Sequence, residues 1–400
     1  MEKFQFIDLF SGIGGFHQAM TQLGGECIMA SEIDANCNII YKKNYGISSD
    51  VNVREVDENS INFKGISVLC GGFPCQAFSK AGKQAGLADK TRGTLFFEIV
   101  RILKAKHPNY IVLENVRNLV SHDKGNTWKI IQSSLHELGY RLEEKPRIIS
   151  PHQFGIPQLR ERVIILGKYD PENVDKPLNI ELNANIKKEN CTIDSILTKS
   201  KVEDKYYIGD EETNVLNIWN NFYQRINKKV IGFPVWVEYF KTTDIDESLP
   251  EWKKEFIRKN QQLYQDNKKT IDEWLRDNNN LDDLIPTHKK FEWQAGTQID
   301  SIWKGIIQFR PSGIRVKSPT CFPALVAMVQ IPIIGKDRRR LTVEEAGRLQ
   351  SFPNPTRDET KMDKDHFYCD PNDQQAYKQF GNSVNVEVIK KCAEALFNCK

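Results

Sequence analysis

The first 169 residues alternate short apolar runs with amphipathic segments, and this alternation constrains the fold more than any other feature of the chain. The apolar runs have the length of strands and lie at residues 4–10, 26–30, 66–72, 110–113 and 163–167. Segments with helical spacing lie between them, at residues 16–23, 94–106 and 127–138. Strands that alternate with helices build a mostly parallel sheet with helices on both faces. We therefore expect an α/β fold with a Rossmann-like main domain.

The strand–helix alternation stops after Tyr169, which indicates a second, smaller domain. Residues 170–205 are polar and marked by prolines, as domain boundaries often are. Residues 206–330 are rich in Trp, Asn and Lys and show no regular pattern, so we expect an irregular architecture there. We assign the main domain to residues 1–175 and 370–400, and the second domain with its hinge segments to residues 176–369.

Within the second domain, residues 249–275 have the apolar spacing of a helix. Trp252 and Trp274 lie at the apolar positions of this pattern. We interpret both as packing residues rather than as platforms for nucleic-acid bases, because tryptophan on the apolar face of a helix usually belongs to a core.

Composition excludes several classes of function. The 400 residues carry a formal net charge of +3, and the nine cysteines form neither a CxxC pair nor a Cys/His cluster. This pattern argues against a metal centre and against a disulfide framework, and it fits a reducing, cytoplasmic setting. The most apolar stretch, residues 322–335, is interrupted by Pro323 and Pro332 and is too short to cross a bilayer. We expect no metal and no membrane segment.

A glycine turn between the first strand and the first helix indicates a cofactor site. Ser11-Gly12-Ile13-Gly14-Gly15 lets a ligand approach the backbone near a helix N-terminus. Glu32 follows the second strand, where a carboxylate can accept ribose hydroxyls. The spacing differs from GxGxxG, which argues against a nicotinamide cofactor and favours another adenosine cofactor. The alternative is that the glycines serve only a tight turn.

The third strand leads into a loop that carries a cysteine. Gly71 and Gly72 end the strand, Pro74 stiffens the loop, and Cys75 follows. A thiol on a stiff loop beyond a strand end is placed for nucleophilic catalysis. The alternative is a buried, inert cysteine, which is the commoner fate of a single thiol. The polar, glycine-containing segment 80–92 that follows has the length of a mobile lid.

Three further charged residues lie at strand ends. Glu114 follows the fourth strand, so it can form an acid/base pair with Cys75, although it can equally cap a helix or form a surface ion pair. Arg160 and Arg162 precede the next strand and, at i and i+2, point to the same side. They either both face the cleft or are both solvated.

The segment 308–340 is basic and contains Arg310, Arg315 and Lys317 among loops and short strands. Arginine and lysine in such loops suit contacts to phosphate, and arginine also suits guanine edges. The alternative is a solvated basic face.

Taken in order, these residues resemble the DNA (cytosine-5) methyltransferases of bacterial restriction-modification systems. The resemblance covers most of residues 3–169 and 337–397. It rests on seven stretches: Phe6 to Gly15, Gly72-Phe73-Pro74-Cys75-Gln76, Arg92 to Phe96, Glu114-Asn115-Val116, Gln158 to Arg162, Arg340-Leu341-Thr342 with Gln350 to Pro353, and Gly381-Asn382-Ser383-Val384. Each stretch alone is weakly specific, whereas seven in the family's order are very specific.

The resemblance implies S-adenosylmethionine as cofactor. The positions that match the family's cofactor contacts are Phe10, Gly12, Gly14, Gly15, Glu32, Ile33, Gly72, Pro74, Leu95, Asn382 and Val384. One position departs from the pattern, because Arg54 stands where an acidic residue is expected. Asp50 or Asp57 is left for that role, and we favour Asp50.

The resemblance also implies a mechanism, in which the Cys75 thiolate adds to C6 of a flipped-out cytosine so that C5 can accept the methyl group. Glu114 is then expected to stabilise the ring at N3, with Arg160 and secondarily Arg162 orienting Glu114 and contacting O2. Gln76 is expected to help close the gap left in the duplex. Contacts to DNA are expected from Lys80, Arg92, Arg310, Arg315 and Lys317.

The family's variable target-recognition region corresponds to residues 180–335, so the resemblance implies a specific duplex DNA sequence as substrate. It further implies a monomer and a cognate restriction endonuclease encoded nearby. Three alternative hypotheses remain at this point. They are cytosine-5 methylation of RNA, a non-catalytic DNA-binding protein on the same scaffold, and a dinucleotide oxidoreductase. The large insertion favours duplex DNA over RNA.

Overall fold

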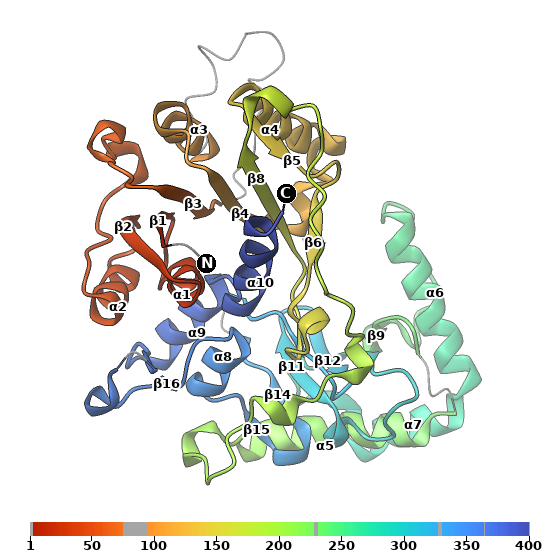
Figure 1. Cartoon of the computed structure of the whole chain (residues 1–400). Coiled ribbons are helices and arrows are strands. Elements are labelled where there is room, and N and C mark those ends of the chain that lie inside the picture. Colours follow the sequence, from red (N-terminus) through yellow and green to blue (C-terminus); the bar gives the residue numbers. More distant parts are fainter. Residues whose placement is uncertain (1–2, 75–94, 228–230, 327–329, 364, 400) are drawn as a thin grey trace. The chain divides into compact units, whose positions relative to one another are not determined.

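The computed structural model describes residues 3–74, 95–227, 231–326, 330–363 and 365–399, which form two compact units (Figure 1). The first unit comprises Met1–Cys191, Ala324–Ala327 and Val343–Lys400. The second comprises Thr192–Pro323 and Met328–Thr342. The chain thus joins the first unit briefly at Ala324–Ala327 and again from Val343 onward, whereas the sequence suggested a return at residue 370.

The first unit is built on a seven-stranded sheet in the order β2-β1-β3-β4-β8-β5, with β6 also paired to β8. Its strands are β1 (Phe4–Leu9), β2 (Gly25–Ser31), β3 (Ile66–Gly72), β4 (Tyr110–Val116), β5 (Tyr140–Leu142), β6 (Arg147–Ile149) and β8 (Arg162–Tyr169). Its helices are α1 (Gly15–Gln22), α2 (Ala35–Tyr45), α3 (Leu95–Lys106), α4 (Asn126–Glu137), α8 (Val343–Leu349), α9 (Asp373–Asn382) and α10 (Val386–Phe397). The short strands β7 (Gln158–Leu159), β16 (Pro355–Thr356) and β17 (Phe367–Tyr368) complete it.

The expected mostly parallel sheet is confirmed, with β8 as the exception. β1 pairs in parallel with β2 and β3, and β3 pairs in parallel with β4. β8 runs antiparallel to β4, β5 and β6. A buried apolar run has the same pattern in either direction, so the sequence could not give the direction of β8.

Helices cover both faces of this sheet because successive strand residues point to opposite sides. Ile7 and Leu9 of β1 belong to the apolar cluster that includes Ile99 of α3 and Ile131 of α4. Residues at even positions of β1 face the other side, where the Phe4 ring lies edge-on to Phe397 of α10 at 5.2 Å. Figure 1 shows α10 lying across the sheet beside α1.

A buried polar network lies beneath the glycine turn that follows β1. The Tyr41 hydroxyl lies 3.5 Å from Asp8 Oδ2 and 2.7 Å from His17 Nδ1. Tyr45 stacks on His17 and donates its hydroxyl proton to the Gly14 carbonyl at 3.0 Å. Asp8 is fully buried, and burial raises its pKa from 3.8 to about 8. The Asp8 carboxyl is therefore mostly protonated at neutral pH.

The second unit contains a six-stranded sheet in the order β15-β14-β11-β12-β10-β9, so it is more regular than the sequence suggested. Its strands are β9 (Val235–Trp236), β10 (Lys290–Gln294), β11 (Ile306–Arg310), β12 (Gly313–Lys317), β14 (Ile333–Ile334) and β15 (Arg339–Arg340). The unit also holds β13 (Phe322–Pro323) and the helices α5 (Asp210–Arg225), α6 (Glu251–Asp266) and α7 (Lys268–Asp277). All of these strands have two to five residues, which is too short for a clear periodic signal.

Aromatic side chains form the core of the second unit. Trp219 of α5 stacks on Phe291 of β10 at 4.9 Å, and Trp274 of α7 packs beside Trp219 at 5.4 Å. The expected packing role of Trp274 is confirmed, because Trp274 is fully buried. The same expectation is wrong for Trp252, which is 59% exposed near the start of α6. The predicted single helix over 249–275 is two helices, α6 and α7.

In the described residues, no helix is long and apolar enough to cross a membrane.

We expect Asp8→Asn to remove a pH-dependent cost to stability. The pKa of Asp8 is higher in the folded chain, at about 8, than its ordinary value of 3.8. The folded chain therefore keeps a proton that the unfolded chain loses, and its stability falls as the pH rises through this window, by about 1.4 kcal/mol per pH unit. Thermal unfolding of both proteins, measured across that pH window, should show the stability of the variant increasing relative to that of the wild type as the pH rises. A constant difference would contradict the burial account.

Candidate active site

The turn after β1 has a backbone that only certain residues tolerate. Phe10 has a φ of +56°, which is strained for a residue with a bulky side chain, and such strain collects at functional sites. Gly12 has a φ of +53°, and a Cβ added there would meet no atom within 4 Å. Gly12 thus borders open space. The buried Ser11 Oγ beside it has no hydrogen-bond partner in the described residues.

The other two glycines of the turn are needed for close packing. A Cβ at Gly15 would lie 2.7 Å from both Ser383 Oγ and Val384 Cγ2, a separation that real Cβ atoms do not show. Gly14 lies against the ring of Tyr45. The glycine turn is therefore held by the segment between α9 and α10 on one side and by α2 on the other.

Glu32 ties the turn to the end of β2. Its Oε2 accepts a hydrogen bond from the Gly12 backbone N–H at 2.8 Å. Its Oε1 accepts from the backbone N–H groups of Ile33 at 2.7 Å and Asp34 at 2.8 Å. A carboxylate held in this way is fixed in orientation and retains lone pairs for a ligand hydroxyl.

A cavity of about 190 Å³ opens beside Glu32. It brings together four residues that the sequence assigned to the cofactor, namely Phe10, Glu32, Ile33 and Leu95. Ile33 is 75% exposed, so an aliphatic surface is available to a ring bound there. Apolar groups around one fixed carboxylate suit a purine nucleoside, and the residues present fit an adenosine-containing cofactor.

Asp50 and Asp57, the two candidates for the second acidic cofactor contact, do not line this cavity. The lining at that place consists of Asn52, Val53 and Arg54. Asp50 instead accepts a hydrogen bond from Asn38 Nδ2 at 3.3 Å. Asp57 accepts from the Asn59 backbone at 3.0 Å, as the cap of a short 3₁₀ turn. The shifted-loop expectation for Asp50 therefore has no support among the described residues.

The ends of β3 and β4 lie side by side, with Gly72 paired in register to Glu114. A Cβ at Gly72 would lie 3.8 Å from Glu114 Oε2 and 3.9 Å from Val384 Cγ1. The side chain of Asn115 donates from Nδ2 to the Phe73 carbonyl at 2.8 Å and is buried. Asn115 thus fixes the chain that leads toward Cys75, a role that the sequence reasoning missed although the residue directly follows Glu114.

Several expected site residues lie outside the described residues. These are Cys75, Gln76, Lys80 and Arg92. Pro74, an exposed residue, is the last one described before Cys75.

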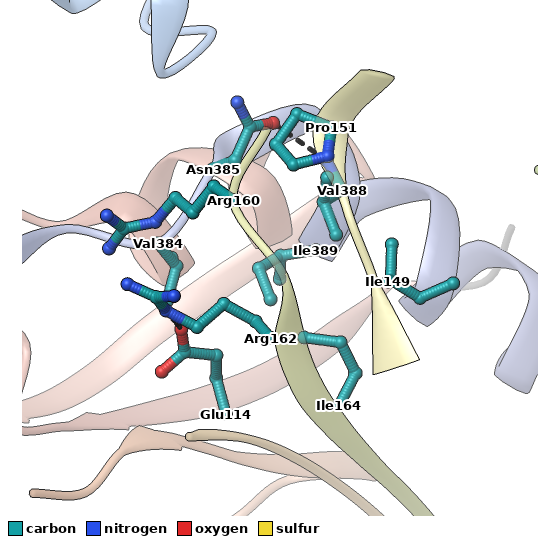
Figure 2. Close-up of a pocket in the computed structure, with 10 residues that line it drawn as sticks. All are labelled: Glu114, Ile149, Pro151, Arg160, Arg162, Ile164, Val384, Asn385, Val388 and Ile389. Carbon is teal, nitrogen blue, oxygen red and sulfur yellow. Dashed lines mark hydrogen bonds and ion pairs between the residues drawn. The ribbon is translucent and has the colours of Figure 1, made fainter. Parts of the chain in front are cut away.

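Glu114 is paired with Arg162 at the heart of the candidate site (Figure 2). Arg162 Nε lies 2.9 Å from Glu114 Oε1, and Figure 2 shows the two side chains meeting beside Val384. Burial raises the pKa of Glu114, while the nearby Arg162 and Arg160 guanidinium groups lower it. The carboxyl is therefore protonated more readily than an exposed glutamate, as hydrogen-bond donation to a ring nitrogen requires.

Arg160 and Arg162 are bonded to different partners beside Glu114. Both arginines border the same pocket as Glu114, which confirms that they share a side. Arg160, however, donates to the carbonyls of Leu325 at 3.1 Å and Ser383 at 2.8 Å and is only 4% exposed. The residue that binds Glu114 is Arg162, because the β4–β8 register sets Arg162 opposite Val116.

The segment 381–385 joins this site to the glycine turn. Val384 borders the pocket of Glu114, whereas Asn382 is exposed at the end of α9. The residue that caps α10 is Asn385, whose side chain accepts from the Val388 backbone N–H at 3.2 Å.

The expected DNA-contacting residues of the second unit lie on short strands, one of the two alternatives that the sequence left for this segment. Arg310 ends β11, and Arg315 and Lys317 belong to β12. In the described residues no group of three or more His, Cys, Asp or Glu side chains could hold a metal ion.

Comparison with known proteins decides the family. Residues 4–398 match the C-5 cytosine-specific DNA methylase family. The chain belongs to this family. It is a DNA (cytosine-5-)-methyltransferase, and S-adenosylmethionine is its methyl donor.

Relatives align with the methyltransferase along nearly its whole length. The type II methyltransferase M.AluI of Cellulosimicrobium cellulans is 32% identical, with 97% of this chain and 91% of that protein covered. The type II methyltransferase M.HpaII of Haemophilus parainfluenzae is 33% identical, with 99% and 91% covered. Among solved structures, the Entamoeba histolytica methyltransferase EhMeth has a TM-score of 0.52 at 17% identity, covering 100% of this chain and 99% of that chain. This last likeness concerns the fold alone.

We expect Gly15→Ala to weaken binding of S-adenosylmethionine and to lower the melting temperature, because the added methyl group would displace Ser383 and Val384. Gly209→Ala is a matched control, since a Cβ there meets nothing within 4 Å. Titration calorimetry and thermal unfolding measure both effects. Equal affinity in wild type and Gly15→Ala would show that the turn does not depend on this contact.

Proposed function

We propose that the chain methylates C5 of one cytosine, flipped out of a specific duplex sequence, through a covalent bond between Cys75 and C6. The observation that carries this proposal is the partly buried ion pair of Glu114 and Arg162 beside Gly72. Cys75 follows Gly72 by three positions in the sequence, and Asn115 holds the intervening Phe73 carbonyl. An acid and a nucleophile are thus supplied from neighbouring strand ends.

The reaction needs a nucleophile because C5 of cytosine is too weakly nucleophilic to be methylated directly. Addition of the Cys75 thiolate to C6 moves the electron pair of the C5–C6 double bond onto C5. S-adenosylmethionine supplies an electrophilic methyl group on a sulfonium sulfur. Loss of the C5 proton to a base then re-forms the double bond as the thiolate leaves C6.

Glu114 acts where charge develops on the ring. A protonated Glu114 donates a hydrogen bond to N3, which stabilises the electron-rich ring during addition. Arg162 fixes the orientation of Glu114 through Nε, and its Nη1 donates to the Glu161 carbonyl at 2.9 Å, which leaves Nη2 for the cytosine O2. Arg160 is a positioning residue that holds the Ser383 carbonyl next to Val384.

The cofactor roles proposed for the residues around Glu32 follow from the cavity beside it. Glu32 would accept the ribose hydroxyls, and Phe10, Ile33 and Leu95 would enclose the adenine. Gly12, with open space at its Cα, would let the cofactor reach the backbone.

The second unit is proposed to recognise the target sequence, in place of the broader range 176–369 that the sequence suggested. The relatives named type II methyltransferases support a role as the modification half of a restriction-modification system. That role implies duplex DNA as partner, a cognate restriction endonuclease encoded nearby, action as a monomer and a place in the prokaryotic cytosol.

We expect Cys75→Ser to abolish methyl transfer to duplex DNA while binding of S-adenosylmethionine and of DNA persists, because a serine hydroxyl is not ionised at neutral pH. Methyl transfer is measured with labelled cofactor on plasmid DNA, with transfer RNA as the control substrate. Retained transfer would exclude Cys75 as the nucleophile. Transfer to the RNA alone would show that the substrate is RNA.

We expect Arg162→Gln to lower the transfer rate and to move its decline at high pH to a higher pH. Arg162 lowers the pKa of Glu114, so its removal raises that pKa and keeps the carboxyl protonated for longer. Arg117→Gln is the control, because Arg117 pairs with Glu161 at the surface and does not contact Glu114. Single-turnover rates measured against pH provide the test, and identical profiles would contradict the assigned role of Glu114.

A further inference from the structure

One face of the sheet in the second unit is polar, and its other face forms the core. On β10, β11 and β12 the core face carries an apolar cluster that includes Phe291, Ile307, Ile314 and Val316. The intervening residues point to the opposite side. Those charged or amide-bearing residues are Lys290, Glu292, Gln294, Gln308, Arg310, Arg315 and Lys317.

Glu292 is the centre of this polar face. Its Oε2 accepts from Arg315 Nε at 3.0 Å and also from Arg310 Nη2. Its Oε1 accepts from the side-chain amide of Gln294. One carboxylate thus serves two guanidinium groups, and the cluster keeps a net positive charge that an acceptor-rich partner would balance.

The two arginines are held differently. Arg310 is the more enclosed, with 14% of its side chain exposed, and its Nε is buried without a partner in the described residues. Arg315 is 24% exposed and is bound to Glu292 through Nε. The terminal Nη1 and Nη2 of Arg315 have no hydrogen-bond or ion-pair partner in the described part of the chain. A fork of two parallel N–H donors is therefore fixed in direction and left open at its end.

We propose that Arg315 reads a guanine base of the target DNA sequence through this fork, with Glu292 fixing its orientation. The inference rests on the proposed role of the second unit in target recognition. Guanine is the base that presents two acceptors, O6 and N7, in the major groove at the spacing of a guanidinium fork. Fixing the arginine in advance lowers the conformational entropy lost on binding. Arg310 is a positioning residue that shares Glu292.

A phosphate also accepts two parallel hydrogen bonds, so the experiment must separate a base contact from a backbone contact. Loss of a phosphate contact weakens binding to every sequence alike. It also reduces the slope of the logarithm of the binding constant against the logarithm of salt concentration by about one. A guanine contact instead lowers the preference for one position of the site.

The test begins with bisulfite sequencing of plasmid DNA from cells that express the wild-type chain, which gives the methylated sequence. Purified wild type, Arg315→Lys and Glu292→Gln are then compared on that duplex and on duplexes with one base pair replaced. We expect Arg315→Lys to reduce the preference for one guanine roughly 10- to 100-fold, because a lysine cannot make the bidentate contact. Glu292→Gln should reduce it less, since the fork remains but is no longer fixed.

The control is Arg225→Lys, which makes the same substitution at an arginine paired with Asp277 on the helical side of the unit. Thermal unfolding of each variant, together with its affinity for S-adenosylmethionine, separates misfolding from altered recognition. If Arg315→Lys unfolds at a lower temperature than the wild type, the test of the proposal is the base preference of the folded Glu292→Gln variant.

Two results would overturn the inference. A uniform loss of affinity with a smaller salt slope would place Arg315 on a phosphate, and an unchanged preference would make the cluster purely structural. A wild-type chain that methylates no duplex would instead overturn the proposed function.

Discussion

The pairing of a buried carboxyl with a guanidinium at the end of β4 is the constraint on which the rest of the site depends. A buried glutamate without a cation would be difficult to ionise, and a fully ionised one could not donate a proton to a base. Arg162 holds Glu114 between these limits, since burial raises the pKa and the arginine lowers it. The antiparallel strand β8 makes this possible, because it brings Arg162 next to the end of a parallel strand.

The same strand ends join catalysis to cofactor binding. Gly72 is small enough that Glu114 and Val384 approach its Cα, and Val384 in turn closes on Gly15 of the glycine turn. The turn is bound to Glu32, which borders the cofactor cavity. A chain of close contacts therefore leads from the cavity to the carboxyl that would act on the base. Larger side chains at Gly72 or Gly15 would separate the two.

Much of this arrangement could be predicted from the sequence, because strong local patterns determine it. The strands β1 to β4 and the helix α3 end close to where the apolar runs end. The gathering of Phe10, Glu32, Ile33 and Leu95 around one cavity agrees with their motif assignment.

The different partners of Arg160 and Arg162 could not be predicted from the sequence, because they depend on the register of β8 against β4. The sequence did not indicate that Glu292 binds two arginines either, since Arg310 and Arg315 lie 18 and 23 residues away from it along the chain. Trp252 and Trp274 share one helical pattern in the sequence, yet Trp252 is exposed near the start of α6 and Trp274 is buried in α7.

The central claim is that Cys75 and Glu114 act on one cytosine, and trapping the covalent intermediate tests it most directly. In DNA that carries 5-fluorocytosine at the target, the fluorine on C5 cannot leave as a proton does, so the enzyme should remain bound after methyl transfer. Peptide mapping of the trapped complex by mass spectrometry should then locate the base on Cys75, with far less adduct in Glu114→Gln. An adduct on another residue, or no adduct from an enzyme that methylates ordinary DNA, would contradict the account.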